Sequence, residues 1–83
     1  MQEFFGPDAH EAYLRWLEEH PDGYVLQINQ SNDRKLHRAN CSRIGANGAI
    51  PPQGEIWTNY AKHCSDDRGQ LMGVTGRCGF CRP

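Results

Sequence analysis

The chain has 83 residues, of which 37% are hydrophobic and nine are glycine, so we expect one small domain with a thin core. A chain of this length buries only about 60% of its unfolded surface, and scaffolds below roughly 80 residues are often reinforced by disulfides, a metal or a partner. No apolar run approaches the length of a transmembrane helix, and a net charge of −1 excludes a strongly basic or acidic protein.

The small net charge hides two halves of opposite sign. Residues 1–22 contain six acids and one base, whereas residues 23–83 contain eight bases and four acids. Within the single domain expected over residues 1–83, we therefore distinguish an acidic first segment, 1–22, from a second segment, 23–83, that holds the sheet and the metal site. Any site for an anion has to be local, because the whole molecule has almost no net charge.

The acidic segment is predicted to form a helix. Gly6-Pro7-Asp8 is typical of a helix start, because proline is tolerated in the first turn and an acid suits the positive end of a helix. Pro21 ends the helix. Apolar residues recur at helical spacing, which predicts a side packed on the core and an acidic side in solvent, with docking of a basic partner as the alternative: Ala9, Ala12, Tyr13, Trp16 and Leu17.

The second segment has the pattern of a small antiparallel sheet. Residues 24–30 and 34–38 are predicted to be strands joined by a turn over 31–33, with residues 45–54 as a loop. A third strand is predicted over 55–63 and leads to Cys64, and a short helix is expected to begin at Ser65. The predicted fold class is α+β, an N-terminal helix packed on a small antiparallel sheet.

Four cysteines lie in the second segment, at positions 41, 64, 78 and 81. The first eight residues have neither the basic start nor the apolar run of a signal peptide, so we expect a cytoplasmic protein with reduced thiols. Two disulfides are the alternative for a secreted chain. The thiols are therefore expected to bind a metal.

The spacing of these thiols is typical of a structural zinc site. Cys78 and Cys81 form a C-x2-C pair at a turn, Cys41 and Cys64 each follow a predicted strand, and His37 precedes Cys41 by four residues. Structural zinc takes four thiolate or imidazole ligands. The first choice of ligands is the four cysteines, and the second replaces Cys64 or Cys41 by His37. Zinc is the expected cofactor, joining the sheet to a C-terminal C-x2-C knuckle.

An enzymatic role is not expected. A C-x2-C pair can perform redox chemistry when a helix follows it and lowers the thiol pKa, but only two residues follow Cys81. The chain has no phosphate-binding loop, no H-E-x-x-H motif and no nucleophile elbow. A closed zinc site also leaves no position for a substrate, so no small-molecule substrate and no catalytic residue are assigned.

Basic and aromatic residues interleave around the expected ligands. Phosphate contact with base stacking requires this combination, whereas the alternative is a solvated polar surface with the aromatic residues in the core. The candidate nucleic-acid-binding residues are Arg34, Lys35, Arg38, Arg43, Trp57, Tyr60 and Lys62.

Part of the chain resembles small His/Cys modules of bacterial and phage proteins, some of them attached to DNA-restriction or DNA-modification enzymes. The resemblance covers residues 24–83 and implies that the four cysteines are the ligands and that the role is recognition. The chain departs from these modules after Cys64, where two glycines weaken the expected helix. The matching segments are Leu36–Cys41, Tyr60–Ser65 and Cys78–Pro83.

The sequence therefore predicts a non-catalytic, zinc-finger-like module that recognises nucleic acid, with no membrane partner. The alternative is a zinc-stabilised protein-interaction module. A contiguous basic face around residues 34–43 favours nucleic acid, and a dispersed one favours a protein partner. The four-cysteine set also predicts that Cys64→Ser loses zinc while His37→Ala keeps it.

Overall fold

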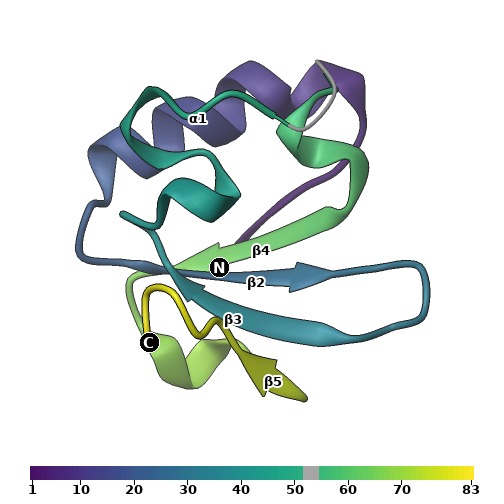
Figure 1. Ribbon diagram of the computed structural model, residues 1–83, viewed down its shortest axis with the longest axis vertical. Coiled ribbons are helices and arrows are strands. Elements are labelled where there is room, and N and C mark those ends of the chain that lie inside the picture. The colour runs from purple at the N-terminus through teal and green to yellow at the C-terminus, as the bar shows by residue number, and fades with distance from the viewer. Residues whose placement is uncertain (52–54) are drawn as a thin grey trace.

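The computed structural model describes residues 1–51 and 55–83. Over these residues the chain forms one α-helix and one five-stranded sheet, so the predicted α+β class is confirmed. The sheet order is β1-β4-β2-β3-β5 (Figure 1). The elements are β1 (Gln2–Phe4), α1 (His10–Glu19), β2 (Tyr24–Ile28), β3 (Arg34–Arg38), β4 (Ala61–Ser65) and β5 (Gly76–Arg77).

The sheet is antiparallel except at one edge. β4 pairs with β1 and β2, and β2 pairs with β3, all antiparallel. β5 pairs with β3 in parallel, so the prediction of an antiparallel sheet is wrong for this strand. The short strands β1 and β5 were not predicted, because three and two residues carry too little alternation to be recognised.

The predicted N-terminal helix is confirmed. Pro7–Ala9 forms a 3₁₀ turn that leads into α1, and the helix ends directly before His20. Tyr13, Trp16 and Leu17 are buried and face the sheet, because their spacing puts them on one side of the helix. Figure 1 shows α1 lying across one side of the sheet.

The predicted hairpin is also confirmed. In the register of β2 and β3, Val25 lies opposite His37 and Leu26 opposite Leu36. The Oδ1 atom of Asn29 accepts hydrogen bonds from the backbone N–H groups of Ser31 and Asp33, 2.9 Å each, and closes the turn. Successive residues of each strand therefore point to opposite faces of the hairpin. This alternation determines the face on which each basic side chain of β3 lies.

The predicted third strand is only partly right. Trp57–Asn59 is a 3₁₀ turn, and β4 starts at Ala61 and continues past Cys64. The backbone here bonds to the start of the helix instead of the sheet: Gly6 N donates to Thr58 O, 2.9 Å, and Trp57 N donates to His10 Nδ1, 3.1 Å. These tertiary contacts override the extended propensity of the segment.

Two other predicted segments take shorter forms. In the predicted loop 45–54, Ala46–Gly48 forms a 3₁₀ turn, and residues 52–54 lie outside the described part of the chain. The short helix expected at Ser65 is a single 3₁₀ turn, Arg68–Gln70, in which the Asp67 carboxylate accepts a hydrogen bond from Gly69 N.

Each face of the sheet has its own apolar cluster. On the α1 side, Val25 and Cys64 pack with the buried side chains of the helix. On the other side Leu26 and Leu36 pack under Leu71, from the segment that follows β4. Among the described residues, no helix combines the length and apolar character needed to cross a membrane. Both cores are small, which agrees with the expectation that such a chain needs reinforcement.

Candidate metal centre and the adjoining recess

Four residues with metal-binding side chains meet at the β3 edge of the sheet. His37 lies on β3, Cys41 follows that strand directly, and Cys78 and Cys81 follow β5. Because β5 pairs with β3, the C-terminal cysteines are brought beside the other two residues. One ligand atom from each residue lies within 4.8 Å of all the others, and the Cys41 and Cys78 sulfurs are 4.0 Å apart. These four residues form the metal group, which could hold a metal ion.

His37 has the environment of a metal ligand. It is 4% exposed, and neither of its ring nitrogens has a hydrogen-bond partner among the described residues. Burial, together with the charges of Lys35 and Lys62, lowers the pKa of His37 to about 4, so its ring is neutral at pH 7. A neutral imidazole offers a lone pair to a metal, whereas a buried and unpaired nitrogen is otherwise costly.

Backbone N–H groups point at the three sulfurs. Arg38 N donates to Cys81 Sγ, 3.2 Å, and Arg43 N donates to Cys41 Sγ. The sulfur of Cys78 accepts from the N–H groups of Phe80 and Cys81. Hydrogen bonds of this kind stabilise negative charge on sulfur and are the outer-sphere contacts expected around metal-bound thiolates.

Cys41 and Cys78 differ in how easily they lose a proton. Burial raises the pKa of Cys41 to about 12, although the N–H of Arg43 opposes this shift. Burial also opposes ionisation of Cys78, but the N–H groups of Cys81 and Phe80 outweigh it and lower the pKa of that thiol. A metal ion binds the thiolate, so metal uptake would release protons, including one from Cys41.

The side chain of Arg38 fixes the C-terminal segment against β3. Its Nε donates to Cys81 O and its Nη2 donates to Arg82 O, 3.0 Å each. With the backbone bond to Cys81 Sγ, Arg38 makes two hydrogen bonds to Cys81 and one to its neighbour Arg82. Arg38 therefore positions Cys81, which differs from the nucleic-acid contact predicted for it.

Cys64 is not part of this group, so the structure does not bring the first-choice set of four cysteines together. Cys64, Val25 and His37 lie in one row across β4, β2 and β3, on the same face. Neighbouring strands are about 4.8 Å apart, so two strand spacings separate Cys64 from His37. Cys64 is fully buried in the core below α1. The set whose ligand atoms meet is the alternative in which His37 replaces Cys64.

The predicted basic cluster is divided between the two faces of the sheet. Strand alternation puts Arg34 and Arg38 on the face of Leu36, where Arg34 Nε donates to Met72 O, 3.2 Å. Lys35 lies on the opposite face, the one that carries His37. The basic residues of 34–43 therefore do not form one continuous face.

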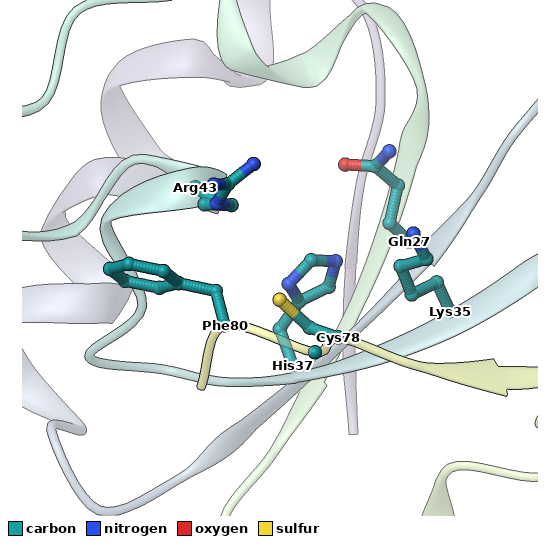
Figure 2. A pocket seen from close by; sticks show the side chains of 7 residues that line it. Gln27, Lys35, His37, Arg43, Cys78 and Phe80 are labelled. Atoms are coloured by element: carbon teal, nitrogen blue, oxygen red, sulfur yellow. The ribbon is translucent and has the colours of Figure 1, made fainter. Parts of the chain in front are cut away.

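The other predicted residues gather around two adjoining hollows beside the metal group. The main recess has a volume of about 590 Å³, and Figure 2 shows Arg43 and Phe80 on one side of it, Gln27 and Lys35 on the other, and His37 and Cys78 between them. A side recess of about 140 Å³ shares Gln27 and Arg43 with it. Three predicted residues, Trp57, Tyr60 and Lys62, line the side recess.

Two residues of the recess were not singled out from the sequence. Phe80 is 61% exposed, and the guanidinium carbon of Arg43 lies 5.0 Å from the centre of its ring. Gln27 lies between Lys62 and Lys35 in the strand register. Phe80 could have been noticed as an apolar residue inside the C-x2-C pair, but Gln27 has no local sequence signal.

No family model, curated protein or solved structure matches the chain, so its function has to be argued from its own geometry.

Proposed function

We propose that this protein is a non-catalytic zinc-binding module that recognises nucleic acid. The observation that carries the metal assignment is the buried ring of His37, which has no hydrogen-bond partner among the described residues and lies among three thiols. Three cysteines and one histidine are a common ligand set for structural zinc, and a site with four protein ligands has no open position for a substrate. Zinc would tie β3 to the C-terminal segment.

The nucleic-acid assignment is supported by the face beside the metal group. Lys35, Arg43 and Lys62 line the two recesses, and aromatic rings lie at both ends, Phe80 at one and Trp57 with Tyr60 at the other. Cations that contact phosphates and exposed rings that stack on bases are the two parts of a single-strand binding surface.

The test is the salt dependence of binding to a labelled oligonucleotide, measured by fluorescence anisotropy on the zinc-loaded protein. Three cations give an expected logarithmic slope of about −3 on duplex DNA and about −2 on a single strand. Lys35→Met with Arg43→Met should reduce the slope on duplex DNA by about 2. The double variant Arg15→Met with Arg77→Met removes the same charge from exposed positions elsewhere and should leave the slope nearly unchanged.

Two results would contradict this proposal. Equal effects of the two double variants would mean that binding is not confined to the recess. No binding of duplex or single strand at low salt would favour the alternative, a zinc-stabilised module for protein interaction, which the division of the basic residues between two faces also favours.

A further inference from the structure

We propose that the two recesses form a binding site for one phosphate group, held by a row of three side chains, Lys62, Gln27 and Lys35, with Arg43 above them. This inference deepens the proposed recognition of nucleic acid and rests on it only for the source of the phosphate. The site lies on the same face of the sheet as His37, next to the metal group.

The row follows from strand register. Gln27 of β2 lies opposite Lys35 of β3 and opposite Lys62 of β4, so the three side chains leave the same face in a line. Neighbouring strands are about 4.8 Å apart, which puts the two lysine Cα atoms about 10 Å apart with the amide of Gln27 between them. An oxyanion above Gln27 is within reach of both flexible lysine side chains.

Lys62 is an ammonium group without an anionic partner. Its side chain is 1% exposed and lines the side recess. Its ammonium donates a hydrogen bond to the backbone carbonyl of Tyr60, 3.3 Å, and lies 5.8 Å from the centre of the Tyr13 ring. Among the described residues no carboxylate lies within ion-pair distance of it. Buried charges in proteins are normally paired, so a buried ammonium beside a cavity indicates a missing anion.

Arg43 closes the site from the opposite side. It lines both recesses, and its guanidinium lies over the ring of Phe80, which restricts its orientation. A guanidinium donates two parallel hydrogen bonds to a phosphate, and three cations around an amide suit a group with several free oxygens better than a carboxylate with two. A base attached to the phosphate could stack on the exposed ring of Phe80.

The local charge remains favourable when the metal is included. Three thiolates with one zinc ion carry one net negative charge, and Glu55 at the side recess adds another, against the three cations. The Glu55 carboxylate already accepts a hydrogen bond from Asn59, 2.7 Å, and the Cys78 sulfur accepts N–H groups from the backbone. One positive charge therefore remains, with Lys35 and Arg43 lining the main recess and Lys62 lining the side recess.

The experiment is a titration of the zinc-loaded protein with inorganic phosphate, in which binding is measured from the ¹⁵N NMR chemical shifts. A parallel titration uses one short single-stranded oligonucleotide. Lys35→Met and Lys62→Met should each weaken phosphate binding by roughly tenfold or more, because each removes a charge-assisted hydrogen bond. Arg15→Met, on the exposed side of α1, is the matched control and should change it less than twofold. Lys35 is exposed, so its variant keeps the test independent of folding.

The outcomes separate the phosphate site from the proposed function. The proposed site is wrong if phosphate does not bind the unsubstituted protein. It is also wrong if phosphate binds the unsubstituted protein and both lysine variants equally. An oligonucleotide that binds all variants equally would show that nucleic acid binds elsewhere on the protein, and would overturn nucleic acid as the source of the phosphate. Lysine-dependent phosphate binding without oligonucleotide binding supports the site and overturns nucleic acid as the source. Sodium acetate as the competing anion should bind at least tenfold more weakly than phosphate, and equal binding would contradict the assignment.

Discussion

His37 and Cys64 lie in the same row of the sheet, but only His37 lies beside the other thiols. The strand β2 separates Cys64 from the edge at which β3, β5 and the C-terminal residues meet. The two residues therefore have different surroundings: His37 is a candidate ligand at the edge, and Cys64 is a small apolar side chain in the core.

The substitution test at this scale compares these two residues. His37→Ala should lose tight zinc binding, because the fourth ligand is removed. Cys64→Ala should keep one zinc per chain and lower the free energy of unfolding by roughly 1 to 2 kcal/mol through lost packing. Zinc content by elemental analysis separates the two, and full zinc in His37→Ala with none in Cys64→Ala would restore the four-cysteine set.

A second prediction at this scale concerns the buried ammonium group. Burial lowers the pKa of Lys62 from 10.5 to about 8, although the neighbouring Cys64 thiolate would raise it. The folded pKa lies below the unfolded one, so the charged form disfavours folding at pH 7. Stability is therefore regained as the pH rises through about 8 towards 10.5.

We expect Lys62→Met to be more stable than the parent at pH 7. The advantage should shrink by roughly 1.4 kcal/mol between pH 7 and 9, because the parent loses its buried charge over this range and the variant has none. Urea denaturation of both proteins across this pH range measures the difference. A constant difference would show that Lys62 titrates normally in the folded protein.

At the scale of elements, the metal group depends on the pairing of β5 with β3. This pair brings Cys78 and Cys81 beside His37, and Arg38 then holds the C-terminal segment in place. Arg34 lies on the same face of β3 but contacts Met72 O, away from the metal group.

We expect Arg38→Met to weaken zinc affinity by about tenfold, because outer contacts that orient a ligand typically contribute this much. Arg34→Met is the control: it removes the same charge from the same strand and should leave the affinity within about twofold. Competition with a chromophoric chelator measures both affinities. Equal losses would mean that general charge, and not the hold on Cys81, determines the effect.

Some elements of the fold were predictable from the sequence and others were not. Helix and hairpin were predictable from periodicity and turn residues, and the His37-x3-Cys41 and Cys78-x2-Cys81 spacings contained the four members of the metal group. Strand alternation alone separates Lys35 from Arg34 and Arg38. The choice between His37 and Cys64 depended on the strand order and on the two-residue strand β5, which have no local sequence signal.

At the scale of the whole molecule, two small cores lie on either side of a thin sheet. The metal group ties together the end of β3, the segment after it and the C-terminal residues, which are up to 44 positions apart in the chain: His37 to Cys81. Structural zinc contributes on the order of 10 kcal/mol in small peptides, as much as the whole stability of many domains. The folded state is therefore expected to depend on the metal.

Native mass spectrometry before and after treatment with a chelator tests this dependence most directly, because one spectrum reports both the bound metal and, through the charge states, the compactness of the chain. We expect one zinc ion per chain in compact charge states, and after chelation a metal-free chain in broad, high charge states. A purified protein that carries no metal, keeps compact charge states and has four free thiols would contradict the central claim.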